Sequence, residues 1–354
     1  MRENFLISTG GSGGHVIPAI ILYQHLNSKT NTIISTDKRG LKYFDNNAYE
    51  FKVVNTPKLN NIFLFPINFF IIIYLTIQSI HFLKKKKIEK VFSTGGYMSI
   101  PVIFAAKLLK LQIFLIEPNL VLGRANKFFL NFSKKIFCYS EEIKNFPAKF
   151  LNQMVIINPL VKENIYQFKN SSLKKSKFTL LIVGGSQGAK IFDENFKNSI
   201  VSISKKIPIK IIQQTSEKNI SNLNNFYLRN NIESEIFTFD ENFINRIYQA
   251  DLCITRAGAS TLAELSTINL PFIAVPLPSS KDNHQLENAN YYKNQNCCWV
   301  LEQKNFEKKI EELLMLILND KRDYLIKKEN LEKLNLNNSW LIVNQKIVKA
   351  IYEN

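Results

Sequence analysis

Two glycine-rich segments in this sequence have the composition of anion-binding loops. Gly10 to Gly14 reads Gly-Gly-Ser-Gly-Gly, and residues 184–189 read Gly-Gly-Ser-Gln-Gly-Ala. Glycine after a strand lets the backbone approach a ligand closely and point its amides at a negative charge. Neither segment leads into the Gly-Lys-Ser/Thr of a P-loop, and Val16 stands where a dinucleotide fingerprint needs a small residue. The pattern indicates phosphate binding without a cofactor signature.

His15 directly follows the first glycine segment, where a helix is expected to begin. The dipole at a helix N-terminus disfavours a positive charge, which suits a histidine that acts as a neutral general base. The alternative is a histidine that only packs against the turn or hydrogen-bonds it. Taken alone, the residue type and its place favour this second reading.

Two segments in the second half combine groups that would bind a nucleoside diphosphate sugar. Gly258 to Thr261 follows an apolar run and can form a helix N-terminus, which is a seat for an anion. Glu264 lies one turn further on, within reach of ribose hydroxyls, and Gln285 offers an amide to sugar hydroxyls. A Ser/Thr pair at a helix start is more often only a cap, so each signal is weak alone.

Short β-rich runs alternate with stretches long enough for helices along the whole chain. This alternation predicts parallel sheets covered by helices on both faces, in an α/β fold. We expect two Rossmann-like domains facing across a cleft: residues 1–160, and residues 161–337 after a joint near Asn158-Pro159. A final helix over 338–354 either closes the second domain or crosses back to the first. The predicted strands are Phe5–Ser8, Thr32–Ser35, Phe51–Val54, Val91–Ser93, Ile113–Ile116, Ile136–Tyr139, Val155–Ile157, Thr179–Val183, Ile209–Gln213, Ile236–Phe239, Leu252–Thr255, Phe272–Val275 and Trp299–Leu301.

The 354 residues carry a formal net charge of +17, with 45% hydrophobic and 21% charged residues. This is ordinary globular usage, which excludes disorder, collagen and coiled coil as descriptions of the whole chain. Residues 1–160 hold +12 of the charge and residues 161–354 only +5. A basic first half favours a nucleic acid, an anionic lipid or a phosphorylated substrate. The four cysteines lack metal-ligand spacing, and the sequence starts without a signal peptide, so we expect a cytoplasmic protein.

Residues Leu59 to Leu83 contain no Lys, Arg, Asp or Glu, and four lysines follow at 84–87. The run is long enough to span a bilayer, but doing so would disrupt the α/β alternation on either side. A helix lying in the membrane interface accounts for the pattern better, with five apolar residues toward lipid and the lysines at anionic headgroups. These residues are Phe65, Phe69, Phe70, Ile73 and Ile77. The alternative is a crossover helix buried wholly in the core.

Seven ordered blocks together resemble the MurG family of bacterial undecaprenyl-diphospho-muramoylpentapeptide N-acetylglucosaminyltransferases. The resemblance covers nearly the whole chain. It implies a GT-B fold with the donor on the C-terminal domain, the lipid acceptor on the N-terminal domain and the last helix crossing back. The blocks are Gly10–Pro18, Gly95–Pro101, Glu117–Lys127, Asn158-Pro159, Gly184–Ala189, Arg256–Glu264 and Asp282–Ala289.

The resemblance also implies site residues. His15 is the expected catalytic base and Glu117 the competing candidate. The donor is expected to contact Ser12, Gly13, Gly14, Asn119, Ser186, Gln187, Asp240, Arg256, Gly258, Ala259, Ser260, Thr261, Glu264, Gln285 and Asn288, with His284 beside the sugar. The lipid acceptor is expected to contact Gly11, Gly13, Gly14, Tyr97 and Asn126.

The chain departs from the family pattern in two places. The family's His-Glu-Gln-Asn becomes Ile116-Glu-Pro-Asn119, so its first His and its Gln are absent. The family's Asn-Pro-Val-Arg becomes Asn158-Pro-Leu-Val, followed by Lys162, which puts one donor contact in question. Glu117 and Asn119 are retained.

The resemblance implies inverting transfer of N-acetylglucosamine from UDP-N-acetylglucosamine to a polyprenyl-diphosphate lipid (lipid I) in peptidoglycan synthesis. It implies no cofactor and no bound metal, with a divalent cation acting without a protein-held site. Expected partners are the two substrates, an anionic membrane surface at the cytoplasmic face and other cell-wall synthesis proteins, and no nucleic acid. The alternatives are another GT-B lipid glycosyltransferase with a diacylglycerol-type acceptor and a UDP-N-acetylglucosamine 2-epimerase.

Overall fold

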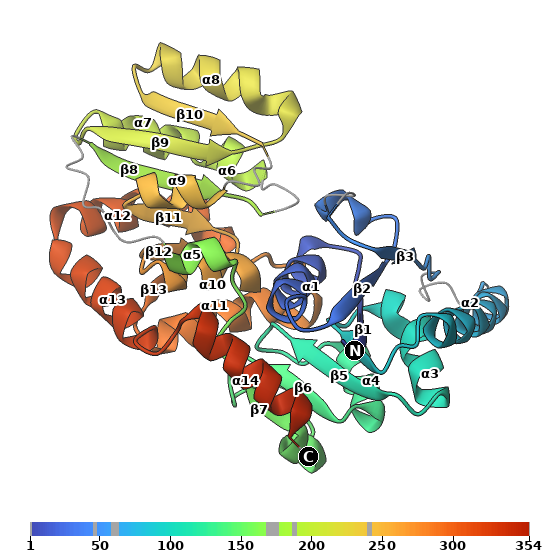
Figure 1. Cartoon of the computed structure of the whole chain (residues 1–354). Coiled ribbons are helices and arrows are strands. Elements are labelled where there is room, and N and C mark those ends of the chain that lie inside the picture. Colours follow the sequence, from blue (N-terminus) through green and yellow to red (C-terminus); the bar gives the residue numbers. More distant parts are fainter. Residues whose placement is uncertain are drawn as a thin grey trace. The chain divides into compact units, whose positions relative to one another are not determined.

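The chain folds into two compact units, each built on a parallel β-sheet (Figure 1). The structure is a computed structural model that describes residues 2–44, 48–57, 64–167, 177–185, 190–238 and 243–353. Unit 1 comprises Met1–Leu160 and Leu341–Asn354, and unit 2 comprises Val161–Trp340.

Unit 1 contains a seven-stranded parallel sheet in the order β3-β2-β1-β4-β5-β6-β7. Its order reverses between β1 and β4, where Leu6 pairs with Val91 in register. Ligands of such sheets bind at the carboxyl ends of the strands beside this switch point. The strands are β1 (Asn4–Ser8), β2 (Asn31–Thr36), β3 (Phe51–Val53), β4 (Lys90–Ser93), β5 (Gln112–Glu117), β6 (Lys135–Cys138) and β7 (Met154–Ile156).

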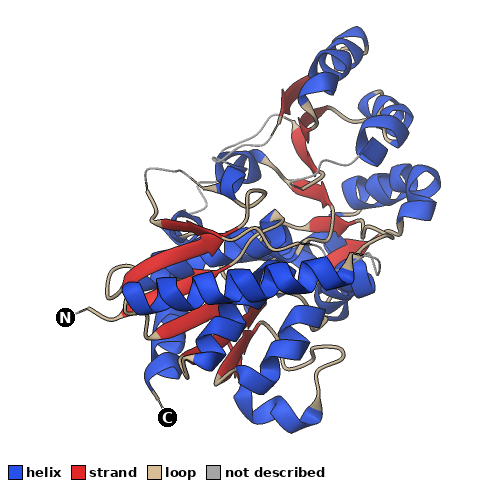
Figure 2. Cartoon of the chain, turned by 90° about the vertical axis from the view of Figure 1, so that its right-hand side faces the viewer, coloured by secondary structure: helices blue, strands red, loops and turns tan. Residues whose placement is uncertain are grey.

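The helices of unit 1 are α1 (Gly13–Leu26), α2 (Phe65–Lys85), α3 (Ile100–Leu108), α4 (Arg124–Phe129) and α14 (Trp340–Tyr352). All residues of α14 except Trp340 belong to unit 1. Short 3-10 turns are η1 (Leu41–Tyr43), η2 (Tyr97–Ser99), η3 (Leu130–Phe132) and η4 (Ala148–Gln153). Proline begins both α2 and α3, where its missing amide proton costs no hydrogen bond. Figure 2 shows the long helix α2 lying across the strands on the face turned to the viewer.

A row of phenylalanines crosses the first sheet and forms part of its core. Phe5, Phe92, Phe114 and Phe137 lie on four neighbouring strands, and successive ring centroids are 5.5, 5.0 and 6.4 Å apart. All four side chains are fully buried. Because buried parallel strands are covered on both faces, such strands read as continuous apolar runs, which is why the sequence located them well.

Unit 2 repeats the same arrangement with six parallel strands in the order β10-β9-β8-β11-β12-β13. The strands are β8 (Phe178–Val183), β9 (Ile209–Gln214), β10 (Glu233–Phe237), β11 (Leu252–Thr255), β12 (Phe272–Ala274) and β13 (Cys298–Val300). The helices are α5 (Glu163–Gln167), α6 (Lys190–Asn195), α7 (Lys197–Ser204), α8 (Ile220–Arg229), α9 (Phe243–Gln249), α10 (Ala259–Thr267), α11 (His284–Asn294), α12 (Phe306–Asn319) and α13 (Lys321–Leu334), with 3-10 turns η5 (Glu217–Asn219), η6 (Lys281–Asn283) and η7 (Gln303–Asn305).

One strand was misplaced by the sequence pattern. The prediction Ile236–Phe239 overlaps only the end of β10, which begins at Glu233. β10 lies at the edge of its sheet, where one side of the strand faces solvent and tolerates charged residues. Glu233 and Glu235 therefore hid the start of the strand from a search for apolar runs.

The C-terminal helix α14 joins unit 1, as the resemblance implied. Val343, Ile347 and Ile351 are buried at helical spacing. The Asn344 side chain donates to the backbone carbonyl of His25 on α1 at 2.8 Å. At the end of the helix, the Tyr352 hydroxyl donates to Glu3. These contacts decide between the two placements that the sequence left open.

Candidate active site

The first glycine segment lies at the switch point of unit 1, directly after β1. Gly13 and Gly14 begin α1, so their amides have no acceptor inside the helix, and neither donates a hydrogen bond within the described part of the chain. The Gly11 amide is different because it donates to Asp37 Oδ1 at 2.8 Å. Gly11 has φ +81°, and a Cβ there would lie 2.7 Å from Met98 Cε. Gly11 therefore shapes the loop, and Gly13 and Gly14 are the amides left to face an anion.

His15 is oriented by a backbone carbonyl that the sequence could not reveal. Its Nδ1 lies 2.7 Å from the carbonyl oxygen of Thr94, the residue after β4. A carbonyl only accepts, so Nδ1 carries the proton and Nε2 is the basic nitrogen of the neutral ring. This is the tautomer and fixation that a general base requires. No residue type signals such a partner, because any residue at position 94 would supply the same carbonyl.

Glu117 ends β5 and is surrounded by hydrogen-bond donors. Oε1 accepts from the backbone amide and the side-chain amide of Asn119, both at 3.2 Å. Oε2 accepts from the Gly123 amide at 2.8 Å and from Asn126 Nδ2 at 2.9 Å. Burial raises the pKa of this carboxyl, while the four donors act in the opposite direction. With its acceptor positions filled, Glu117 fits a residue that holds the 117–126 loop better than one that removes a substrate proton.

Asn126 is buried beside the second glycine pair of unit 1. Its Nδ2 also donates to the Ile116 carbonyl at 3.0 Å. Gly95 has φ +84°, and a Cβ there would lie 3.1 Å from the Asn126 amide, so the backbone passes closely over this side chain. The structure thus brings His15, Thr94, Glu117 and Asn126 together at the carboxyl ends of β1, β4 and β5.

A cluster that the sequence analysis missed lies on the other side of the first glycine loop. Arg39 donates to Asp37 through Nε at 2.8 Å and Nη2 at 2.6 Å, and Nη2 also donates to the Tyr97 hydroxyl at 2.5 Å. Tyr97 was expected at the acceptor site, but Asp37 and Arg39 were not. Their signal in the sequence is a charged Asp-Lys-Arg directly after the apolar run of β2, at the same sheet edge as the glycine loop.

In unit 2, the N-terminus of α10 lies at the corresponding switch point, after β11. Gly258 caps the helix with extended backbone. The Ser260 hydroxyl is buried and has no hydrogen-bond partner among the described residues. A buried hydroxyl costs free energy unless a ligand or water satisfies it, so its orphan state is a feature of a binding site.

Glu264 follows one turn later on the same helix. Burial raises the pKa of this carboxyl to about 7, while the charge of Lys162 acts to lower it. Lys162, which stands near the family's missing arginine, therefore acts electrostatically on the carboxylate expected to bind ribose.

Arg256 does not have the geometry expected of a group that stabilises the leaving diphosphate. It is buried, with Nη1 donating to the Val275 carbonyl at 3.2 Å and Nη2 to Gln303 Oε1 at 2.7 Å. Burial lowers its pKa. These bonds join the loops after β11, β12 and β13, so in this structure Arg256 positions the loops around α10.

Of the sugar-binding candidates on α11, Gln285 and Asn288 contact neighbouring loops. Gln285 Oε1 accepts from the Leu277 amide at 2.9 Å, which leaves its amide nitrogen as a donor. Asn288 is buried and donates to the Ala257 carbonyl at 3.2 Å, directly before the α10 cap. His284 is half-buried at the start of α11, where its Nδ1 lies 2.8 Å from the Lys281 carbonyl oxygen. The predicted donor residues Ser186, Gln187 and Asp240 lie outside the described residues.

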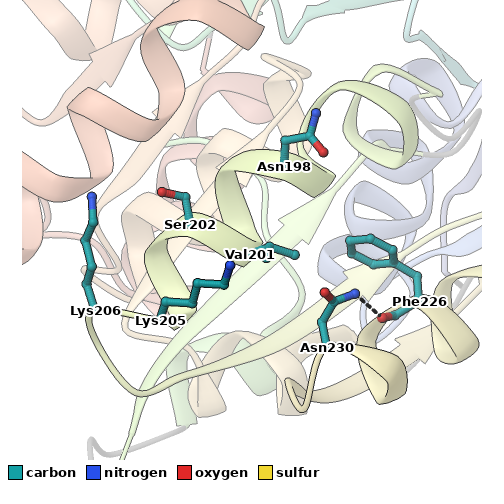
Figure 3. A pocket seen from close by; sticks show the side chains of 7 residues that line it. All are labelled: Asn198, Val201, Ser202, Lys205, Lys206, Phe226 and Asn230. Atoms are coloured by element: carbon teal, nitrogen blue, oxygen red, sulfur yellow. Dashed lines mark hydrogen bonds between the residues drawn. The ribbon is translucent and has the colours of Figure 1, made fainter.

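Two further features bear on binding chemistry. Within the described ranges, no group of three or more His, Cys, Asp or Glu side chains is placed to hold a metal ion. A hollow of about 410 Å³ lies between α7 and α8 of unit 2 (Figure 3). It is lined by Asn198, Val201, Ser202, Lys205, Lys206, Phe226 and Asn230, none of which is a predicted site residue.

The similarities of this chain to known proteins indicate first which class of enzyme it belongs to. The glycosyltransferase family 28 N-terminal domain matches residues 5–138, and the family's C-terminal domain matches residues 179–339. The crystal structure of Acinetobacter baumannii MurG superposes with a TM-score of 0.78 over 99% of both chains, at 21% identity. A UDP-N-acetylglucosamine 2-epimerase also shares the fold, with a TM-score of 0.62 at 11% identity over 93% of this chain and 90% of that one. The fold is GT-B, and the protein is a family 28 glycosyltransferase.

The particular family follows from sequence similarity over the full length. The chain is 45% identical over 356 residues, covering 100% of both sequences, to a Pelagibacter ubique protein. That relative is named UDP-N-acetylglucosamine–N-acetylmuramyl-(pentapeptide) pyrophosphoryl-undecaprenol N-acetylglucosamine transferase. The chain belongs to this family, the MurG family.

Proposed function

We propose that this protein transfers N-acetylglucosamine from UDP-N-acetylglucosamine to the muramoyl sugar of lipid I, forming lipid II and UDP. In the inverting reaction a hydroxyl oxygen of the acceptor sugar attacks the anomeric carbon. The new β-1,4 C–O bond forms as the bond to the UDP oxygen breaks, and the hydroxyl proton passes to a base. The full-length 45% identity to a transferase of this name is the observation that carries the assignment.

His15 is the base in this proposal. Thr94 fixes Nδ1–H, so Nε2 receives the proton, and α1 begins with backbone amides that disfavour a persistent imidazolium. In this proposal the diphosphate that leaves with uridine is bound in unit 2 by the first amides of α10 and by the Ser260 hydroxyl, which has no partner among the described residues. No step in this scheme calls for a protein-held metal or a cofactor.

A transfer assay tests the proposal directly. Purified protein is given radiolabelled UDP-N-acetylglucosamine and either lipid I or diacylglycerol in detergent. We expect label to enter the lipid fraction only with lipid I. Transfer to diacylglycerol would favour the sister lipid glycosyltransferases instead, and conversion of the free nucleotide sugar without an acceptor would favour the epimerase.

Glu264 gives a pH-dependent prediction for donor binding. Ribose hydroxyls donate to the ionised carboxylate, and this carboxyl has a pKa raised to about 7. The donor KM should therefore fall about five- to tenfold between pH 6 and pH 8, as the carboxylate ionises. Glu264→Gln should raise the donor KM at pH 8 roughly tenfold or more and flatten this pH dependence. Steady-state kinetics at fixed acceptor measure both, and an unchanged pH profile in the variant would refute the ribose role.

The outer face of α2 supports binding to a membrane surface. α2 has the length and hydropathy to cross a bilayer, but only 22% of its apolar window is buried in the protein. Phe65, Phe69, Phe70, Ile73 and Ile77 are all exposed, with Phe70 at 69%. The residues buried against the protein are mostly small and polar: Asn68, Thr76 and Ser79. This exposure contradicts the alternative of a wholly buried crossover helix.

The surface around α2 extends the same pattern. Leu108 on α3 and Phe128 on α4 are exposed at 66% and 52%. The helix ends in the lysine run 84–87, in which Lys86 pairs with Glu50 at 2.6 Å. An apolar face bordered by lysines is typical of a protein that lies on an anionic leaflet. We place the protein at the cytoplasmic face of the membrane, with this face toward the lipid.

Charge placed on the outer face of α2 should weaken this binding. The double variant Phe70→Glu/Ile77→Glu should reduce flotation with vesicles containing anionic phosphatidylglycerol roughly tenfold or more. Leu228→Glu is the matched control, because Leu228 is 75% exposed on α8 of unit 2. It should float like the unmodified protein. Equal flotation of all three proteins would contradict the assignment of this face.

A further inference from the structure

The guanidinium of Arg39 is held in one orientation beside the first glycine loop. Two of its nitrogens are bound by Asp37 Oδ2, and its plane lies over the Tyr97 ring, with Cζ 5.3 Å from the ring centroid. A Cβ built on Gly11 would lie 3.6 Å from Arg39 Nη2. The cation therefore adjoins the loop that presents the Gly13 and Gly14 amides.

Asp37 explains why this orientation is fixed. Its Oδ1 accepts from the amides of Gly11 and Gly40, at 2.8 and 2.9 Å, while Oδ2 accepts from Arg39. These bonds hold the pKa of Asp37 below its ordinary value against the opposing effect of burial, so the carboxylate stays charged. One carboxylate thus ties the glycine loop, the turn after β2 and the guanidinium into one rigid group.

The two charges of this pair are not equally accessible. The Asp37 side chain is 7% exposed, whereas that of Arg39 is 46% exposed. Arg39 Nη1 donates no hydrogen bond to any described residue. The pair therefore turns its negative partner inward and presents a positive, hydrogen-bonding edge outward.

We infer that Arg39 is a substrate-binding residue that contacts the diphosphate of the lipid acceptor, and that Asp37 is its positioning residue. The two N–H groups of Arg39 Nη1, beside the Gly13 and Gly14 amides, match the oxygens of a diphosphate, to which a guanidinium donates charge-assisted hydrogen bonds. The Tyr97 hydroxyl accepts a hydrogen bond from Nη2 and so helps to hold the guanidinium at this anion site. This inference rests on the proposed function, because it identifies the acceptor as the source of the diphosphate.

A binding measurement tests the contact independently of catalysis. Inorganic diphosphate is titrated into the full-length protein by calorimetry, with saturating UDP present to occupy the donor site. We expect Arg39→Gln to weaken diphosphate binding at least tenfold. Lys38→Gln removes the same charge from an exposed neighbour and should change it less than twofold. Equal loss in both variants, or no loss in Arg39→Gln, would overturn the inference.

Kinetic measurements then distinguish a direct contact between Arg39 and the lipid acceptor from a role in which Arg39 only supports the first glycine loop. Arg39→Gln should raise the KM for lipid I roughly ten- to hundredfold and leave the donor KM within twofold. Arg39→Lys keeps the charge but lacks the planar guanidinium that Asp37 holds in one orientation, so it should restore only part of the affinity. If Arg39→Gln fails to fold, Tyr97→Phe removes only the hydroxyl on Nη2 and should weaken diphosphate binding several-fold. No weakening in Tyr97→Phe would then count against the seat.

The two proposals fail in different ways. If the unmodified protein binds diphosphate through Arg39 but does not transfer sugar to lipid I, the proposed acceptor is wrong and the anion seat stands. If transfer to lipid I occurs but Arg39→Gln keeps its acceptor KM and its diphosphate binding, the function stands and Arg39 has no part in it.

Discussion

Replacing His15 with Ala should lower kcat by about 10²–10⁴-fold while the donor KM changes less than threefold. The reason is that this variant removes the group proposed to accept the proton of the attacking hydroxyl. Thr94 fixes His15 with Nδ1 protonated at 2.7 Å, so removal of the ring removes the base without disturbing donor groups on α10. Steady-state kinetics with lipid I and UDP-N-acetylglucosamine measure the split between kcat and KM.

Two controls distinguish loss of the base from damage to the loop. His15→Asn keeps a side-chain N–H that can reach the Thr94 carbonyl but has no basic nitrogen, so its kcat should be as low as that of His15→Ala. Added imidazole should restore part of the turnover of His15→Ala, because the cavity left by the ring can admit a diffusible base. Turnover close to that of the unmodified protein in either variant would exclude His15 as the base.

Replacing Glu117 with Ala should destabilise unit 1 by about 3 kcal/mol or more, because it leaves four donors without their acceptor. For a unit of this size, the thermal midpoint should fall by about 6–12 °C. Glu117→Gln keeps the size of the side chain, so its thermal midpoint should lie between those of Glu117→Ala and the unmodified protein. Thermal unfolding followed by circular dichroism measures the shift, and Glu141→Ala is the control, because Glu141 is an exposed carboxylate in the same unit.

The activity of Glu117→Gln decides between the two roles proposed for this residue. A residue that holds the 117–126 loop should leave folded enzyme with a kcat within about tenfold of normal below the unfolding transition. A catalytic base would lose at least about 10²-fold without any change in stability. A stable but inactive Glu117→Gln would therefore return Glu117 to the role of base and displace His15.

The sequence predicted the fold because the strands of both sheets are continuous apolar runs. Buried parallel strands need no polar face, so runs such as Thr179–Val183 stand out from the helices around them. The start of β10 does not stand out in this way, because this strand at the sheet edge carries Glu233 and Glu235. The strand order came only from the structure, since pairing joins residues far apart in the chain. The placement of α14 on unit 1 was implied by the family resemblance, whereas helical spacing alone left it open.

The sequence by itself determined the residue types that carry the chemistry: glycine loops, His15, Glu264 and the apolar face of α2. Their identities and local spacing are enough to indicate phosphate, base, ribose and lipid chemistry. Tertiary structure alone decided what each group does with its hydrogen bonds. In the folded chain the Thr94 carbonyl orients His15, and backbone and side-chain amides occupy the acceptor positions of Glu117. Arg256 bonds to neighbouring loops inside the protein, and Arg39 lies beside Gly11. The physical reason is that a hydrogen bond depends on distance and direction between atoms, and only the folded chain sets these for residues from different strands.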